Sequence, residues 1–438
     1  MDSVLGRFLV SFSFFAVSVF GSLRLFAFIR KLFPNESQRI VFFHPFCDAG
    51  GGGERVLWVS VRSILDEYSG KKVDIAIISA SERSKSSIFS LIETQFGLKF
   101  SEFEKSRISF LEAPLSNWLL PQSWSFVTIF GQNLSAIFVF FLSLAFGNFF
   151  CFLPDVFIDT TGFSFIYPFA WILGSKIIAY VHYPTMTPEA VEKKIGFKKL
   201  YHLLFLTVYR FCGGFATKIV TNSRWTNERL RSAWNRSDAV ILYPPVKIEK
   251  KKIHSARENA VVSLGQFRPE KNHAMQLRIF ARLKNMKSCC NEFWMIGGAR
   301  DAEDLQRVEN LKKIARDMEI SVNFFVNLTR DEVDEKLSKA KCAIHTMVDE
   351  HFGISLIEFM AAGLPVVAHR SGGPEKDILN KENGFLAETV DEFANFVDTC
   401  VKDFDNFQIQ EMIIRSTDSL SRFNDDKQFG KTFAKLLD

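Results

Sequence analysis

Short apolar runs, many of them β-branched, alternate with longer stretches of helical pattern along most of this chain. Five runs precede a polar, basic stretch at residues 244–259, and five more follow it. The ten runs are Arg39–Phe43, Val73–Ser79, Val156–Asp159, Lys176–Val181, Lys218–Thr221, Ala260–Leu264, Phe293–Ile296, Val322–Val326, Cys342–His345 and Pro365–Ala368. Strands that alternate with helices form doubly wound parallel sheets, so the pattern predicts an α/β protein.

The basic stretch divides the pattern into two parts. We therefore expect two Rossmann-like domains, at residues 36–247 and 255–438, that face each other across a cleft. The last helix is expected to be able to pack back on the first domain. Ligands of such sheets bind at the carboxyl ends of the strands, so the loops that follow the predicted strands are the candidate sites.

Residues 1–33 carry a different pattern. Phe8–Phe20 is predominantly apolar, and with the residues up to Phe28 its length suits a membrane span of about 20 residues. Basic residues follow the span, which favours leaving the rest of the chain in the cytosol. We expect an uncleaved N-terminal membrane anchor helix. The alternative is a signal peptide with a secreted body. Four Asn-x-Ser/Thr triplets would then be glycosylation acceptors, and they begin at Asn35, Asn133, Asn235 and Asn327.

A second apolar stretch, Phe126–Leu153, is also long enough to cross a membrane. Polar residues and glycines interrupt it, and a crossing here would put the two halves of the chain on opposite sides. We therefore expect a helix that lies against the membrane or dips into it. A multi-spanning membrane protein or transporter is the alternative.

Composition narrows the class of protein further. Of 438 residues, 47% are hydrophobic and 24% are charged, which excludes a disordered chain. The 48 Phe indicate that some apolar surface meets lipid, and a net charge of +5 is too small for a nucleic-acid binder. The seven Cys form neither a CxxC pair nor a Cys/His cluster, which argues against a disulfide scaffold or a zinc site.

Two loops after predicted strands have residues that suit phosphate binding. Gly50–Gly53 lies between a strand and a helix, where glycines let the backbone approach a ligand; a purely structural tight turn is the alternative. The loop lacks the dinucleotide-binding pattern and its acidic partner, which disfavours a dehydrogenase. In the second loop, Arg268 and Lys271 could grip a diphosphate, or they could form a solvated helix start.

The segment from Asp349 to Val367 reads as loop, helix, glycine stop and strand. Glu350 and Glu358 are eight residues apart, and eight steps of about 100° place them on different faces of a helix. We therefore assign Glu350 to the loop and Glu358 to a helix that begins near Gly353. The amides of Gly353 and Ile354 would face an anion, and the carboxylates could accept hydrogen bonds from sugar hydroxyls. The alternative for Glu358 is a surface position on an amphipathic helix.

These motifs resemble those of a known family. The Glu350-x7-Glu358 pattern, followed by AGLPV and GGPE, resembles the retaining glycosyltransferases of the GT-B fold, family four. Four longer segments resemble the alpha-1,2-mannosyltransferases of asparagine-linked glycosylation. They are His44–Trp58, Val181–Met186, Thr221–Thr226 and Gly265–Asn272.

The resemblance implies the GT-B fold and GDP-mannose as donor, with no metal. It implies that the fourth and fifth mannoses are added to dolichol-diphosphate-linked Man3GlcNAc2 at the endoplasmic reticulum membrane, with the catalytic domains facing the cytosol. Other mannosyltransferases of the pathway are candidate partners, and nucleic acid is not. A GT-B enzyme using a UDP-sugar with another lipid, and a non-catalytic subunit of a glycosylation complex, are the alternatives.

The resemblance also implies roles for individual residues. Glu358 would hold the ribose of GDP, Glu350 the donor mannose, and Lys271 with Arg268 the diphosphate. His182 would face the reacting sugar, although as a bare sequence feature, a lone His before Tyr-Pro, it favours the alternative of a structural histidine. The family pattern has an arginine after Gly265, where this chain has Gln266, and Arg268 could replace it. The loop residues that would approach the donor phosphates or the acceptor are Gly51, Gly52 and Gly53. Retention without an evident nucleophile implies front-face substitution, in which the leaving GDP needs charge stabilisation.

Overall fold

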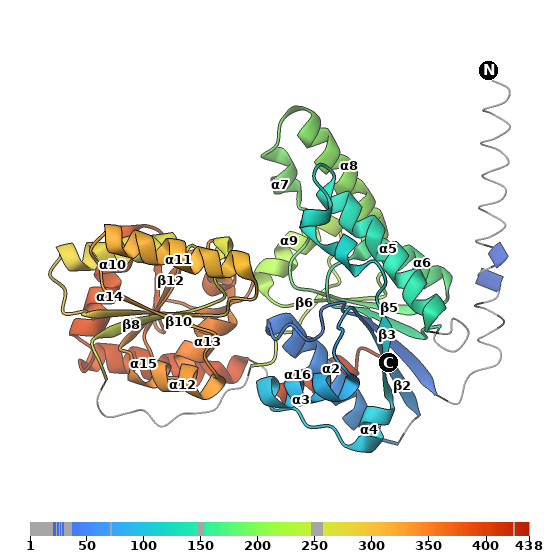
Figure 1. Cartoon of the computed structure of the whole chain (residues 1–438), viewed down its shortest axis with the longest axis horizontal. Coiled ribbons are helices and arrows are strands. Elements are labelled where there is room, and N and C mark those ends of the chain that lie inside the picture. Colours follow the sequence, from blue (N-terminus) through green and yellow to red (C-terminus); the bar gives the residue numbers. More distant parts are fainter. Residues whose placement is uncertain are drawn as a thin grey trace. The chain divides into compact units, whose positions relative to one another are not determined.

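The computed structural model describes residues 21, 22, 24, 25, 27, 29, 37–70, 72–147, 153–246, 257–423 and 425–437. The chain divides into two compact units (Figure 1). Unit 1 comprises Met1–Asn222, Asn227–Leu242 and Lys427–Asp438, and unit 2 comprises Ser223–Thr226 and Tyr243–Asp426. Most of the predicted anchor at 1–33 lies outside the described residues, so the anchor stays a prediction.

Unit 1 is built on a seven-stranded sheet in which all paired strands are parallel. The strand order is β3-β2-β1-β4-β5-β6-β7. The strands are β1 (Gln38–Phe43), β2 (Val73–Ser79), β3 (Ile108–Glu112), β4 (Val156–Asp159), β5 (Lys176–Val181), β6 (Lys218–Thr221) and β7 (Val240–Ile241). Central strands buried on both faces need continuous apolar runs, which explains why these segments are visible in the sequence.

Helices cover both faces of this sheet (Figure 1). On one face lie α5 (Thr128–Phe146), α6 (Tyr167–Ile172) and α8 (Gly196–Gly213), and on the other α2 (Gly52–Glu67), α3 (Lys85–Phe96) and α16 (Asp426–Ala434). The remaining helices and 3₁₀ turns are α4 (Glu102–Ser106), α7 (Pro188–Glu192), α9 (Arg224–Trp234), η1 (Ser116–Leu119), η2 (Pro121–Ser123) and η3 (Ser164–Ile166).

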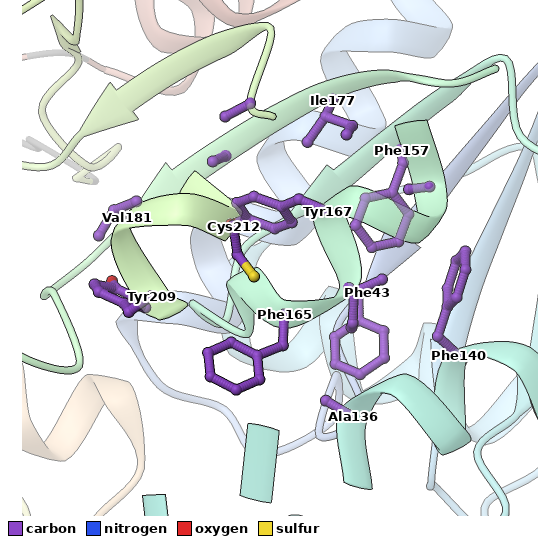
Figure 2. Packing of buried hydrophobic residues seen from close by; sticks show 14 of the residues in the cluster. Phe43, Ala136, Phe140, Phe157, Phe165, Tyr167, Ile177, Val181, Tyr209 and Cys212 are labelled. Atoms are coloured by element: carbon purple, nitrogen blue, oxygen red, sulfur yellow. The ribbon is translucent and has the colours of Figure 1, made fainter. Parts of the chain in front are cut away.

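Aromatic side chains dominate the core beneath α5 and α8. Figure 2 shows Phe43, Phe140 and Phe157 gathered below the sheet, and the Phe140 and Phe157 ring centroids are 5.2 Å apart. On the opposite face, α16 packs Phe429 and Phe433 into the core with α2 and α3. The last helix of the chain therefore belongs to unit 1, although the preceding residues belong to unit 2.

Unit 2 has a six-stranded parallel sheet in the order β10-β9-β8-β11-β12-β13. The strands are β8 (Ala260–Leu264), β9 (Glu292–Gly297), β10 (Val322–Val326), β11 (Cys342–His345), β12 (Val366–His369) and β13 (Phe385–Ala387). The helices are α10 (His273–Asn285), α11 (Ala302–Asp317), α12 (Arg330–Lys339), α13 (Ile354–Ala361), α14 (Val390–Lys402) and α15 (Phe407–Ser419), with short turns η4 (Pro269–Lys271), η5 (Pro374–Ile378) and η6 (Leu420–Arg422). One core lies under α10, α11 and α14 and the other under α12 and α13, so this sheet is also doubly wound.

The apolar stretch Phe126–Leu153 forms α5 over part of its length. Within the described part of the chain, α5 is the one helix that is long and apolar enough to cross a membrane. Ala136, Val139, Phe140 and Leu144 are buried in the core of unit 1. One side of α5 is thus a core surface, and its predicted contact with a membrane stays a prediction.

Candidate functional site

Each sheet reverses its winding direction between two neighbouring strands. In unit 1 the reversal lies between β1 and β4, and in unit 2 it lies between β8 and β11. The connections leave such a pair of strands in opposite directions, and open α/β sheets bind ligands beyond the carboxyl ends of the strands at this point. The loops after these four strands are therefore the first places to look for chemistry.

In unit 1 the carboxyl ends of three neighbouring strands bring polar residues together. His44 follows β1, Thr160 follows β4, and His182 follows β5. His44 Nδ1 lies 2.7 Å from Thr160 Oγ1, and His44 Nε2 lies 3.6 Å from a carboxylate oxygen of Glu54 on α2. The predicted residue His182 is thus one member of a group that also contains His44 and Glu54.

The glycine loop lies beside this group. The helix α2 begins at Gly52, and the Gly51 amide donates to Glu54 Oε2 at 2.6 Å. A Cβ built on Gly53 would lie 3.7 Å from His182 Nε2 and 4.0 Å from His44 Cε1. The structure therefore brings the loop predicted from the sequence within reach of both histidines.

The electrostatics of this group favour an ionised Glu54. Burial alone would raise the pKa of Glu54, but the hydrogen bond and charge of His44, with the Gly51 amide, outweigh it and lower the pKa to about 2. A carboxylate held ionised beside a histidine keeps that histidine in place.

Replacement of Glu54 by Gln is expected to destabilise unit 1 in a pH-dependent manner. Because the folded pKa lies below the ordinary value of 4.5, the stabilisation is complete above pH 4.5 and is lost as pH falls toward about 2. The shift corresponds to about 3 kcal/mol at neutral pH. Urea unfolding of wild type and Glu54→Gln between pH 3 and pH 7 measures this loss of unfolding free energy. Glu112→Gln, at an exposed position, is the control. A loss of stability that does not vary with pH would contradict this assignment.

In unit 2 the loops after β8 and β11 are joined by an ion pair. Lys271 Nζ lies 2.5 Å from Glu350 Oε2 and 3.2 Å from Met347 Sδ. Thr346 supports this contact, because its hydroxyl donates to the Lys271 carbonyl at 3.1 Å. Two predicted site residues, 79 positions apart in the sequence, thus meet at the reversal point of the sheet.

The carboxylate of Glu350 has three partners and only 11% of its side chain is exposed. His345 Nε2 lies 3.0 Å from Oε2, and the His351 amide donates to Oε1 at 3.1 Å. Burial opposes ionisation, but the His345 hydrogen bond and the Lys271 charge outweigh it and hold the pKa of Glu350 well below its usual range. Burial lowers the pKa of His345 in turn, so this imidazole is neutral at physiological pH and positions Glu350 by a hydrogen bond.

The backbone of the Glu350 loop is held by the turn after β12. The Gly373 amide donates to the Glu350 carbonyl at 2.7 Å, and the Asp349 amide donates to Ser371 Oγ at 2.7 Å. Gly372 has a φ of +69°, and a Cβ there would lie 2.3 Å from the Glu350 carbonyl oxygen. Only glycine fits at this close approach, and this explains why the turn after β12 contains glycine.

The start of α13 lies next to Glu350. Its N-cap is Gly353, with a φ of +108° and no side-chain cap. A Cβ on Gly353 would lie 3.6 Å from Glu350 Cγ. In the first turn the Leu356 amide donates to the Gly353 carbonyl at 3.0 Å. The Gly353 and Ile354 amides precede that bond, at the end of the helix where unpaired amides can bind an anion, and their role as phosphate ligands stays a prediction.

Glu358 lies within α13 and pairs with a cation that the sequence analysis did not single out. Its carboxylate forms an ion pair with Arg330 at the start of α12, and Arg330 Nε also lies 3.1 Å from Asp334 Oδ1. Burial lowers the pKa of Arg330, but the two carboxylates outweigh it and raise the pKa. Only 15% of the Glu358 side chain is exposed, so it is not a surface residue of an amphipathic helix.

The other predicted residues of unit 2 lie in the loop after β8. Gly265 directly follows that strand, and a Cβ there would lie 3.5 Å from the Lys271 side chain. Arg268 precedes η4 and is partly buried, as is Gln266. The structure places Arg268 in the same short loop as Lys271, as predicted, and leaves its role as a phosphate ligand a prediction.

Four residues of these sites were given no role by the sequence analysis. They are His44, Glu54, Arg330 and His345. His345 is the last residue of a predicted strand, and a polar side chain at a carboxyl end was the available signal. Arg330 had no such signal in the sequence, because its partner Glu358 is 28 residues away.

The fold and the charged loops define a class of protein. The chain has two doubly wound parallel-sheet units, and the second has a lysine and a helix start at its reversal point. This arrangement is typical of a GT-B glycosyltransferase. Solved structures agree on the fold. HepE of Anabaena, solved with UDP, gives a TM-score of 0.65 at 16% identity, covering 91% of this chain and 99% of that one. Sucrose-phosphate synthase of Thermosynechococcus elongatus gives a TM-score of 0.65 at 14% identity, and the match covers 91% of this chain and 98% of the synthase.

Sequence comparisons identify the family. A model of the ALG11 mannosyltransferase N-terminus matches residues 37–234, and one of glycosyl transferases group 1 matches residues 246–412. Curated relatives named GDP-Man:Man(3)GlcNAc(2)-PP-Dol alpha-1,2-mannosyltransferase include one from Dictyostelium discoideum, 32% identical, covering 91% of this chain and 85% of its own length. The relative from Homo sapiens is 33% identical, and the match covers 91% of this chain and 86% of the relative. The chain belongs to this family of alpha-1,2-mannosyltransferases.

Proposed function

We propose that this chain transfers mannose from GDP-mannose to dolichol-diphosphate-linked Man3GlcNAc2 in alpha-1,2 linkage. The fourth and fifth mannoses of the glycan precursor would be added in this way, at the endoplasmic reticulum membrane and from its cytosolic side. The names of the relatives support the donor and the acceptor. The observation that carries the chemistry is the Lys271–Glu350 pair beside the start of α13.

The donor site of this proposal lies in unit 2. Lys271 and Arg268 bind the diphosphate, and the amides of Gly353 and Ile354 face it from the positive end of the α13 dipole. Glu350, already ionised, accepts hydrogen bonds from mannose hydroxyls. Gly265 and Gln266 line the loop that approaches the nucleotide.

The reaction breaks the bond between the mannose anomeric carbon and the GDP oxygen. The acceptor hydroxyl attacks from the face that the GDP leaves, through an oxocarbenium-like state, so the alpha configuration is retained. Negative charge grows on the diphosphate as the bond breaks, and Lys271, Arg268 and the α13 amides stabilise it. The departing diphosphate can take the proton that the acceptor hydroxyl loses. The expectation that no metal takes part stays a prediction.

The proposal also gives roles to residues of unit 1. His182 is proposed to contact the reacting sugar, and the amides of Gly51, Gly52 and Gly53 to approach a phosphate or the acceptor. The group formed by His44 and Glu54 supports this role, because it places an ionised carboxylate and a second imidazole next to that loop.

Replacement of Glu358 by Ala is expected to raise KM for GDP-mannose and to change kcat little. The carboxylate is proposed to hold the ribose, which is the same in the ground state and the transition state. A hydrogen bond to a charged group contributes about 1.5–3 kcal/mol, so KM should rise by about ten- to a hundredfold. Arg330 keeps Asp334 as a partner, so the fold should persist. Glu335→Ala, on the exposed side of α12, is the matched control. A lower kcat at unchanged KM would contradict the ribose role.

The proposed function is tested by incubating the purified protein with GDP-mannose and a synthetic lipid-diphosphate Man3GlcNAc2 acceptor. The product should grow by one and then two hexoses, which alpha-1,2-mannosidase removes. UDP-glucose and UDP-N-acetylglucosamine should neither serve as donors nor compete. Transfer from a UDP-sugar, or no transfer from GDP-mannose, would overturn the proposal.

A further inference from the structure

The outer side of α8 is apolar although it faces solvent. Exposed fractions reach 86% for Ile195, just before the helix, and 82% for Phe197 in its first turn. The exposed apolar residues of this segment, called here the α8 face, are Ile195, Phe197, Leu200, Leu203, Leu204 and Phe211. Most are three or four positions apart, so they line one side of the helix. The opposite side, with Phe205 and Tyr209, packs into the core of unit 1.

Four lysines border the α8 face at its N-terminal end. Lys193, Lys194, Lys198 and Lys199 are all exposed, and the sequence from 193 to 214 has no Asp or Glu. An amphipathic helix with large apolar residues and lysines at its border is the kind of surface that binds at an anionic lipid interface.

The neighbouring helix α5 also has exposed apolar residues. Phe130 of α5 packs edge-on against Phe205 of α8, with ring centroids 5.1 Å apart, and Figure 1 shows the two helices side by side. Leu134 and Phe138 of α5 are 47% and 58% exposed. The apolar residues left uncovered thus come from two helices that are packed together.

We propose that the α8 face docks unit 1 on an anionic phospholipid bilayer. The charge argues for this occupant over a second copy of the chain. Residues 193–214 contain no Asp or Glu, so a second α8 face offers the lysines no carboxylate, whereas an anionic bilayer offers them phosphates. The apolar residues would enter the acyl boundary while the lysines contact lipid phosphates. This inference rests on the proposed function in one respect: it identifies the surface by which the chain would contact the membrane. It does not depend on which sugar donor the enzyme uses.

The test uses the full chain in vesicles with brominated acyl chains, which quench a fluorophore on contact. A fluorescent amino acid replaces Phe197 in one variant and Phe407 of α15, which is 77% exposed in unit 2, in the control. Vesicles of phosphatidylcholine with phosphatidylserine should quench emission from position 197 and not from position 407. Reversing the four lysines to Glu, or omitting phosphatidylserine, should remove most of the quenching, while melting curves remain those of wild type.

Three outcomes would overturn the proposal. Emission from position 197 that is unquenched in anionic vesicles excludes insertion of this face. Equal quenching at 197 and 407 shows contact that is not specific to α8. Cross-linking between copies through position 197, without quenching, identifies a second chain as the occupant. Each outcome is independent of mannosyl transfer, so a failure here leaves the donor assay unaffected.

Discussion

Replacement of Lys271 by Ala is expected to lower kcat by about a hundredfold or more, the usual cost of removing one preorganised group that stabilises transition-state charge. Lys271 is paired with Glu350, whose side chain lies beside Gly353 at the start of α13. Affinity for GDP itself should fall too, because the diphosphate loses a ligand. Steady-state transfer assays and titration with GDP measure the two effects.

The same substitution leaves the Glu350 carboxylate without its lysine, which could destabilise unit 2. The double variant Lys271→Ala, Glu350→Gln removes that buried charge and separates unfolding from loss of chemistry. Lys312→Ala, at an exposed ion pair on α11, is the matched surface control. A folded Lys271→Ala enzyme with wild-type turnover would show that the diphosphate is held elsewhere.

Glu350→Gln is expected to lower kcat by about a hundredfold as well, while GDP binds normally. The substitution keeps the size of the side chain and removes the charge that faces the mannose. Affinity should therefore fall for GDP-mannose and not for GDP. Lys271→Ala differs, because it should lower the affinity for GDP itself. Isothermal titration with both ligands distinguishes them.

The pH dependence provides an internal check on Glu350. Because its pKa lies well below the usual range, the group stays ionised throughout the neutral range and adds no inflection to the wild-type kcat profile between pH 5 and pH 8. Its contribution to stability is present above the unfolded pKa and is lost only in strong acid. A wild-type inflection in this range that Glu350→Gln removes would contradict the ionised carboxylate.

Much of the fold could be predicted because its strands are buried on both faces. Val73–Ser79 and Lys176–Val181 have the predicted bounds. Three strands were missed for a physical reason. Ile108–Glu112 is partly exposed at an edge of its sheet, Val240–Ile241 has two exposed residues, and Phe385–Ala387 has three residues at an edge. Short edge strands lack the continuous apolar run on which the prediction rests.

The candidate site could be predicted only where it follows from local spacing. The eight-residue separation correctly assigns Glu350 to a loop and Glu358 to a helix. The contact between Lys271 and Glu350 depends on β8 and β11 being neighbours, and strand order is not visible in a single sequence. The same holds for Arg330, whose pairing with Glu358 joins two helices.

The central claim is that unit 2 holds the sugar nucleotide by its diphosphate. A solved complex of the chain with GDP tests this claim most directly. The account predicts a phosphate oxygen within hydrogen-bond distance of Lys271 Nζ and of the Gly353 or Ile354 amide. GDP bound away from the loops that follow β8 and β11 would contradict it.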